Sequence, residues 1–191
     1  YRGEVSYRGA DVSGMRTDQL VNMGISYVPQ VDNVFPSLSV IENMRMGGNK
    51  LQPQTLSDRI ERSLEMFPDL RSREFDLAAS LSGGERQMLA ISRALISNPN
   101  FLLLDEPVAG VAGPLAMKIF DNLRKLVDDT GISILIIEHN MDFILRQGVD
   151  RIIVMNEGGI LMKGTPDEVR GNREVIEAYL GSSGEIGGEE E

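Results

Sequence analysis

The 191-residue chain contains no cysteine and a single histidine. Without cysteine, a disulfide framework, a zinc–thiolate site and a cysteine nucleophile are excluded, and a reducing, cytosolic setting is permitted. No apolar run approaches the roughly 20 residues that a transmembrane helix requires, and no signal-peptide pattern opens the chain. The chain does have 41% hydrophobic and 25% charged residues, a composition that suits one globular domain or one domain with a small lobe.

Charge of one sign predominates, because 29 acidic residues outnumber 19 basic ones and give a net charge of −10. This surplus disfavours a broad nucleic-acid contact, which needs Lys and Arg to displace phosphate counterions. The Gly-, Ser- and Glu-rich segment 181–191 has Ile186 as its one large apolar residue. Its composition predicts a disordered acidic tail.

Apolar segments separated by helical patterns predict an α/β layer fold with a parallel sheet. The uninterrupted run 101–104 (FLLL) is typical of a strand that is buried on both faces. Two helical patterns broken by prolines indicate either a small helical lobe or a helical hairpin of the same domain. We expect strands over residues 2–7, 25–28, 101–104, 132–137 and 151–155, and helices of the lobe over 39–47 and 55–67.

Polar residues follow three of these strands directly. Gln30 comes after the segment 25–28, Asp105 and Glu106 end the run 101–104, and His139 follows 132–137. Ligands of parallel α/β sheets bind beyond the carboxyl ends of the strands. There, one carboxylate can hold Mg²⁺ and its neighbour can activate water, while a glutamine can orient water and a histidine can donate to a phosphate oxygen. These four side chains, Gln30, Asp105, Glu106 and His139, are of the types that a phosphoryl-transfer site uses.

A second pattern lies at residues 81–85 (LSGGE). Ser82 and Glu85 have the spacing of a capping box at a helix start. Ser, Gly and Gly at such a start also expose a hydroxyl and backbone N–H groups to an anion. Taken singly, each of these signals is more often structural: a helix cap, a strand that meets solvent, or a surface histidine.

Taken together and in this order, the motifs resemble those of the ATP-binding cassette (ABC) ATPases. By that resemblance Gln30 lies in the Q-loop, 81–85 is the signature motif, 101–106 is Walker B, and His139 is the switch histidine. The implied fold is an α/β P-loop NTPase core with a parallel sheet plus a small helical lobe. Four further stretches are similar to the branched-chain amino acid importer ATPases of the LivG/LivF kind: 87–91, 137–142, 164–169 and 175–180.

The resemblance also implies cofactors, roles and partners. ATP and Mg²⁺ are the expected cofactors, and two ATP molecules would lie between two head-to-tail ATPase subunits. The lobe would dock membrane permease subunits at the cytoplasmic face of the cell membrane. A solute-binding protein would deliver the solute to these permease subunits. No nucleic-acid partner is expected. By the same resemblance, Glu106 would be the catalytic base, His139 would contact the γ-phosphate, and Gln30 would contact the attacking water or Mg²⁺. Asp105 would belong to the Mg²⁺ shell. The residues that would contact the partner's ATP are Ser82, Gly83, Gly84 and Glu85.

We expect the domain boundaries to follow the motifs. Residues 1–30 form a partial N-terminal core segment, 31–90 the helical lobe with the signature motif, 91–180 the α/β catalytic core, and 181–191 the tail. The transported solute and the choice between a homodimer and a heterodimer stay open.

The chain departs from the family pattern in two places. No P-loop (Gly-x-x-x-x-Gly-Lys-Ser/Thr) occurs in it, and family spacing places that motif some tens of residues before Tyr1. We therefore interpret the chain as lacking the N-terminal part of the core, and expect these residues alone to bind ATP poorly and to leave apolar surface uncovered. Ala112 stands where the family often has an aspartate.

Two alternatives stay open at this point. One is a non-hydrolytic half that contributes only its signature motif to a complete partner. The other is a chromosome-maintenance or DNA-repair ATPase, which the acidic charge and the lack of sustained heptads between Gln30 and Leu81 disfavour.

Overall fold

A computed structural model describes residues 3–146 and 148–180. The chain forms two compact units, Tyr1–Ile137 and Glu138–Glu191, which we call the first and the second unit. Within the described ranges, no helix combines the length and the apolar character that a bilayer crossing needs.

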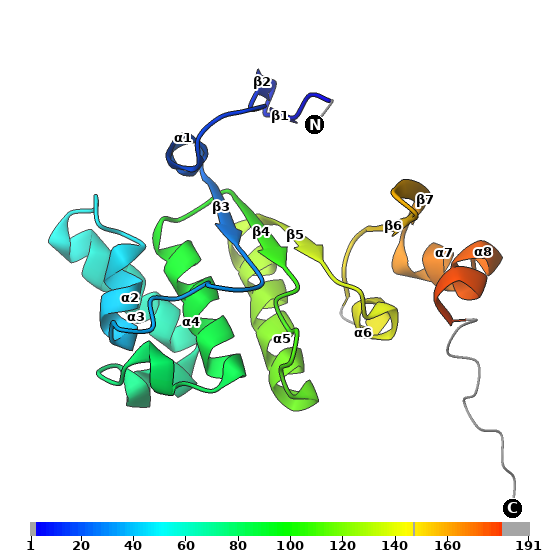
Figure 1. Cartoon of the computed structure of the whole chain (residues 1–191). Coiled ribbons are helices and arrows are strands. Elements are labelled where there is room, and N and C mark those ends of the chain that lie inside the picture. Colours follow the sequence, from blue (N-terminus) through cyan, green and yellow to red (C-terminus); the bar gives the residue numbers. More distant parts are fainter. Residues whose placement is uncertain (1–2, 147, 181–191) are drawn as a thin grey trace, which may run out of the picture. The chain divides into compact units, whose positions relative to one another are not determined.

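A three-stranded parallel sheet forms the centre of the first unit (Figure 1). Its order is β3-β4-β5, made of Ile25–Val28, Phe101–Asp105 and Ser133–Ile137. The register pairs Tyr27 with Leu103. The parallel sheet predicted from the apolar runs is therefore confirmed.

The two faces of this sheet differ in burial. On one face, Val28, Leu102 and Leu104 are buried in a core that includes residues of α4 (Gly83–Ile96) and α5 (Gly113–Thr130). On the other face, Tyr27, Leu135 and Ile137 are 52%, 45% and 56% exposed. The alternation follows from the period of two along a strand. Because parallel sheets are normally covered on both faces, this apolar face offers a surface for a further layer of structure.

The predicted helical patterns form real helices that pack with α4. These are α2 (Val40–Met46), α3 (Pro53–Met66) and the 3₁₀ helices η1 (Pro68–Arg73) and η2 (Ala78–Ser80). Ser39 starts α2 through a capping box with Glu42, whose Oε2 accepts a 2.7 Å hydrogen bond from Ser39 N. Their interior is fully buried at Met44, Leu64, Phe67, Leu70 and Met88.

The segment before β3 is only partly extended. β1 (Ser6–Tyr7) and β2 (Ala10–Asp11) form a short hairpin, and α1 (Thr17–Asn22) follows. Of the strand expected over residues 2–7, residue 2 lies outside the described residues, and among residues 3–7 only Ser6–Tyr7 form a strand, because the antiparallel partner β2 is equally short. Positive φ angles at Arg8 and Gly9 close the two-residue turn between them.

The second unit contains an antiparallel pair of strands and short helices. β6 (Ile152–Asn156) pairs with β7 (Gly159–Gly164), so the strand expected at 151–155 belongs to a separate sheet. The helices are α6 (Met141–Arg146), α7 (Pro166–Arg170), α8 (Arg173–Val175) and the π-helical turn η3 (Ile176–Leu180). The core of the second unit contains Ile152, Val154, Val169 and Val175. The predicted acidic tail, 181–191, lies outside the described residues.

Candidate functional site

The chain turns sharply where β4 ends. Asp105 is the last residue of the strand, and Glu106 has a φ of +44°, in the left-handed region. The Glu106 N–H donates a 2.9 Å hydrogen bond to the carbonyl of Ile137 on β5. Because non-glycine residues enter that region only when their surroundings hold them there, the neighbouring strand fixes the backbone of Glu106. Both carboxylates therefore project from a rigid strand end.

Gln30 reaches the same place from the neighbouring strand. β3 ends at Val28, and Pro29 separates it from Gln30. Gln30 Nε2 donates a 2.7 Å hydrogen bond to Glu106 Oε2. The structure thus brings together Gln30, Asp105 and Glu106, three residues selected from the sequence.

Tyr27 belongs to this cluster, although the sequence analysis did not select it. Its hydroxyl donates a 3.1 Å hydrogen bond to Asp105 Oδ2. Tyr27 is paired with Leu103, so Asp105 is two residues further along on the same face. Burial raises the pKa of Tyr27, and the hydrogen bond to Asp105 and the negative charge of Asp105 raise it further. Strand register was the signal that could have revealed Tyr27.

Residues 82–85 form the predicted capping box at the start of α4. Glu85 Oε2 accepts a 2.7 Å hydrogen bond from Ser82 N, and Ser82 Oγ accepts one of 3.3 Å from Glu85 N. Ser82 and Gly83 are exposed, whereas Gly84 is buried. The motif therefore presents an ordered, exposed helix start.

The two glycines of the motif have different surroundings. A Cβ added to Gly84 would lie 2.1 Å from Leu115 Cδ2 on α5, so any larger residue there would displace the Leu115 side chain. A Cβ on Gly83 would meet no atom within 4 Å, and its φ is not positive. Neither packing nor backbone conformation explains Gly83.

The segment after Gln30 is tied to α4. Asn33 Nδ2 donates a 2.8 Å hydrogen bond to Gln87 Oε1, and both side chains are buried. The Arg93 guanidinium lies 4.9 Å from the centre of the Phe35 ring. A displacement of the Gln30 segment would therefore act on the helix that begins with the signature motif.

Ala112, at the start of α5, and His139, in the second unit, are two further residues that the sequence analysis singled out. His139 is exposed and belongs to the second unit, so its role stays a prediction. Ala112 is the N-cap residue of α5 and makes no side-chain cap. An aspartate there could accept hydrogen bonds from the first turn of the helix, which alanine cannot.

The donor set of the cluster suits a magnesium ion that substrate phosphates help to hold. Among the described residues, no group of three or more His, Asp or Glu side chains could hold a metal unaided. Asp105 and Gln30 offer oxygen atoms, the ligands that Mg²⁺ prefers, and Mg²⁺ sites with one carboxylate plus phosphates are common. The residues present therefore fit Mg²⁺ bound together with a nucleotide.

Comparison with known families defines the class of protein. Residues 1–109 match the family described as ABC transporter. The chain belongs to this family, whose ATP-binding members bind nucleotide and hydrolyse ATP to drive transport. Residues 160–185 match a narrower family, described as Branched-chain amino acid ATP-binding cassette transporter. Both matches confirm the resemblance inferred from the motifs.

Named relatives agree with this assignment. The chain is 37% identical over 169 residues to the probable branched-chain amino acid transport ATP-binding protein LivF of Archaeoglobus fulgidus, covering 88% of this chain and 71% of the relative. It is 36% identical over 179 residues to the high-affinity branched-chain amino acid transport ATP-binding protein BraG of Pseudomonas aeruginosa, covering 94% and 76%. The lipopolysaccharide export system ATP-binding protein LptB of Escherichia coli is 32% identical, covering 94% and 74%.

Solved structures confirm the fold class. An ATP-binding cassette of an ABC transporter in its ADP conformation superposes with a TM-score of 0.81 at 28% identity, over 94% of this chain and 77% of that one. A dimeric cassette in a post-hydrolysis state with ADP and Pi gives 0.75 at 25% identity, over 86% and 74%.

Proposed function

We propose that this chain is the ATP-hydrolysing part of an importer that takes up branched-chain amino acids through a membrane permease. The observation that carries the proposal is the contact between Gln30 and Glu106 beside Asp105, at the carboxyl end of a parallel sheet in an ABC-family chain. The names of LivF and BraG support the solute class.

We assign one task to each of these residues and to His139. Glu106 accepts the proton of the attacking water, and Gln30, hydrogen-bonded to it, orients that water and contacts Mg²⁺. Asp105 holds the magnesium ion of the MgATP substrate, and Tyr27 fixes the position of its carboxylate. His139, from the second unit, contacts the γ-phosphate as negative charge develops.

The phosphates also need a P-loop, which these residues do not contain. The apolar face with Tyr27, Leu135 and Ile137 is a suitable surface for it, because a parallel sheet is stable when covered on both sides. Further residues of the same polypeptide or a partner chain can supply this element. In both cases Ser82, Gly83, Gly84 and Glu85 meet the ATP that the opposite subunit of a dimer holds.

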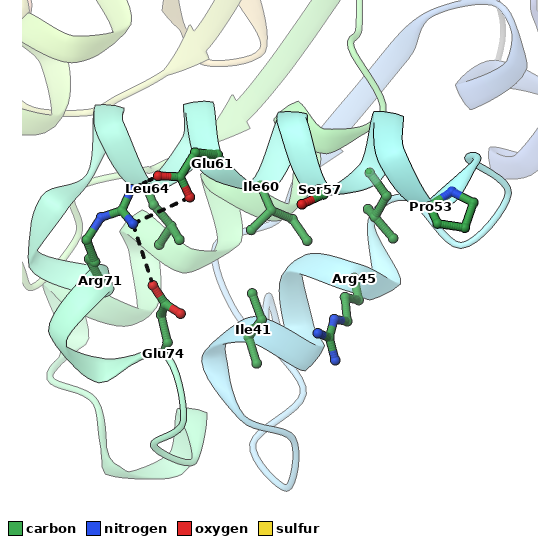
Figure 2. A pocket seen from close by; sticks show the side chains of 10 residues that line it. Ile41, Arg45, Pro53, Ser57, Ile60, Glu61, Leu64, Arg71 and Glu74 are labelled. Carbon is green, nitrogen blue, oxygen red and sulfur yellow. Dashed lines mark hydrogen bonds and ion pairs between the residues drawn. The ribbon is translucent and has the colours of Figure 1, made fainter.

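A pocket in the helical part is the proposed docking site for the permease. It has a volume of about 410 Å³ and lies between α2, α3 and η1 (Figure 2). Arg71 is held by ion pairs to Glu61 and Glu74, whereas Arg45 projects from α2 at the rim (Figure 2). An apolar side chain next to an acidic one on a cytoplasmic segment of the permease would complement this surface. Its apolar lining consists of Ile41, Pro53, Leu56, Ile60 and Leu64.

Docking there would keep the ATPase peripheral, at the cytoplasmic face of the membrane.

A charge reversal tests this docking site. Replacing Arg45 by Glu should weaken binding to the permease about tenfold, since it reverses a charge at the rim of the interface. The same exchange at Arg62, an exposed α3 residue that does not line the pocket, is the control. Equal effects of both exchanges would contradict the docking site.

Uptake into vesicles tests the function as a whole. The complete transporter, with its P-loop and solute-binding protein, is reconstituted in liposomes and given labelled leucine, isoleucine or valine, with lysine as a comparison. We expect ATP-dependent uptake of the branched-chain amino acids. Glu106→Gln should keep ATP binding and lose turnover by about 10²–10⁴-fold, while Glu174→Gln on α8 should change neither.

Each failure has a distinct meaning. Turnover that survives in Glu106→Gln removes Glu106 as the base. Hydrolysis without uptake of branched-chain amino acids removes the solute class. Dimerisation with a complete partner but no hydrolysis at this chain's own site supports the non-hydrolytic half instead.

A further inference from the structure

Arg73, the last residue of η1, contacts three groups around the signature motif. Its Nε donates to Asp76 Oδ2. Its Nη2 lies 3.4 Å from both the carbonyl oxygen and Oγ of Ser80, two residues before Ser82. Its Nη1 donates a 3.2 Å hydrogen bond to Glu85 Oε1 on α4.

Glu85 connects Arg73 to Ser82. One carboxylate oxygen, Oε1, accepts from Arg73, and the other, Oε2, accepts from Ser82 N at 2.7 Å. A capping box alone uses only the second of these bonds. Here the capping carboxylate is held from both sides, so its rotamer is set by Arg73 as well as by Ser82.

The surroundings strengthen this contact. The side chains of Arg73 and Glu85 are 31% and 21% exposed, so both are partly withdrawn from solvent. Charge-assisted hydrogen bonds are stronger than neutral ones, and they gain as the local dielectric falls. The Arg73–Glu85 contact is therefore partly shielded from solvent.

We propose that Arg73 is a positioning residue for the signature motif: through Glu85 and Ser80 it holds Ser82 in the orientation that meets the ATP of the opposite subunit. The inference rests on the proposed function of Ser82. Arg73 itself touches no reacting atom. Its contribution is to order residues 80–82 before the two subunits meet, which lowers the entropy lost on association.

Arg71 provides a matched control in the same short helix. Its guanidinium pairs with Glu61 and Glu74 at the pocket of Figure 2, and its side chain is 45% exposed. Arg71→Gln removes the same charge from η1 and makes no change at Glu85 or Ser80. A general loss of η1 stability would affect both variants, whereas loss of positioning would affect Arg73→Gln alone.

The first measurement is amide hydrogen exchange in the complete, P-loop-containing protein without nucleotide. Arg73→Gln should raise exchange at Ser82 N–H about tenfold, because its acceptor on Glu85 is less firmly held. Arg73→Lys should restore part of the protection, and Arg71→Gln should match the wild type. Unchanged exchange at residues 81–85 in Arg73→Gln overturns the inference. Should Arg73→Gln fail to fold, exchange in Arg73→Lys that equals the wild type overturns it as well.

The second measurement is ATP-driven dimerisation, followed by sedimentation in a Glu106→Gln background that prevents turnover. Arg73→Gln should raise the dimer dissociation constant about tenfold with unchanged ATP affinity of the monomer. Ser82→Arg should abolish the dimer. If Ser82→Arg dimerises normally, the proposed role of the motif fails even where the exchange result holds. If Ser82→Arg blocks dimerisation and Arg73→Gln leaves the constant unchanged, the positioning role fails.

Discussion

Gln30 and Glu106 are 76 residues apart in the sequence and are joined by a 2.7 Å hydrogen bond from Gln30 Nε2 to Glu106 Oε2. They follow the neighbouring parallel strands β3 and β4, whose carboxyl ends meet at one edge of the sheet. The bond keeps the Glu106 carboxylate oriented while Glu106 is ionised, because the amide donates to it. An acid in place of Gln30 would reverse this effect.

Gln30→Glu is therefore predicted to move the acid limb of the pH–kcat profile to higher pH. Two carboxylates at hydrogen-bond distance repel each other when both are ionised, so in the variant one carboxylate of the pair keeps its proton to higher pH. A base must be unprotonated, hence turnover should be lost at low pH and recover as pH rises. Steady-state ATP hydrolysis between pH 5 and about 9 measures the shift.

Gln54→Glu is the control for this substitution. Gln54 Nε2 donates a 2.9 Å hydrogen bond to Asp58 Oδ1 on α3, so the exchange creates a similar carboxylate pair away from the cluster. Its acid limb should stay where the wild type has it. An unmoved limb in Gln30→Glu would show that Glu106 is not the group whose ionisation limits turnover.

The phenol of Tyr27 gives a second pH-dependent prediction, tested without Mg²⁺ or nucleotide. Burial, then the hydrogen bond to Asp105 and its charge, raises the pKa of Tyr27 above the ordinary value of about 10. The folded state therefore keeps this proton longer than the unfolded state. The stabilisation that this pKa difference gives the folded state is complete below pH about 10 and is lost as pH rises through the folded-state pKa of Tyr27.

Ultraviolet titration of phenolate formation, compared with Tyr27→Phe, isolates this residue. Asp105→Asn should lower the pKa of Tyr27 but leave the contribution of burial. Tyr7→Phe, which removes a phenol from the β1–β2 hairpin, is the matched control and should leave the Tyr27 titration in place. Titration of Tyr27 at its ordinary pKa would contradict the contact with Asp105.

The sequence was sufficient to predict elements that depend on local rules. The run 101–104 predicts a strand that is buried on both faces. In the structure the strand is present, with Leu102 and Leu104 buried and Phe101 and Leu103 only partly buried. Ser82 and Glu85 predict a helix start by spacing alone. Asp105, Glu106 and Gln30 were identified as strand-end residues for the same reason. Each of these predictions depends only on residues that are close to one another in the sequence.

Other features depend on register or on side chains distant in the sequence. Tyr27 reaches Asp105 only because β3 and β4 pair with Tyr27 opposite Leu103. Arg73 reaches Glu85 because η1 packs beside α4, and no periodicity reveals that geometry. The pairing of β6 with β7 was also missed, because apolar strands of parallel and antiparallel pairs look alike when they are short.

Gly83 and Gly84 are predicted to respond differently to alanine. Gly84→Ala places a methyl group 2.1 Å from Leu115 Cδ2 and should lower the free energy of unfolding by about 1–3 kcal/mol. Gly83→Ala meets no neighbour, and alanine favours helix, so stability should be equal or slightly higher. Thermal unfolding measures both.

ATP-driven dimerisation separates function from folding at these positions. Gly83→Ala should weaken the dimer although the monomer is intact, since its methyl group occupies the exposed surface that we propose meets the opposite subunit's ATP. Ala94, on the same helix, offers Ala94→Gly as a control that changes stability without touching the motif. A Gly83→Ala variant with a normal dimer would contradict the assigned contact.

The contact between Asn33 and Gln87 leads to the last prediction. Gln87 is 7% exposed, its Oε1 accepts from Asn33, and its Nε2 has no hydrogen-bond partner in the structure. Asn33→Ala leaves the second polar atom of this buried amide unpaired as well, which should cost about 1–3 kcal/mol of unfolding free energy. Gln87→Met keeps the volume and removes both polar atoms.

The double variant distinguishes a specific bond from general packing. If the hydrogen bond stabilises the link between the Gln30 segment and α4, Asn33→Ala combined with Gln87→Met should be more stable than the sum of the single changes predicts. Urea unfolding of the four proteins gives this coupling energy, expected at about 0.5–3 kcal/mol for a contacting pair. Strictly additive effects would mean that the two amides do not depend on each other, and that displacement of Gln30 is transmitted to α4 by another route, for which the Phe35–Arg93 contact is the next candidate.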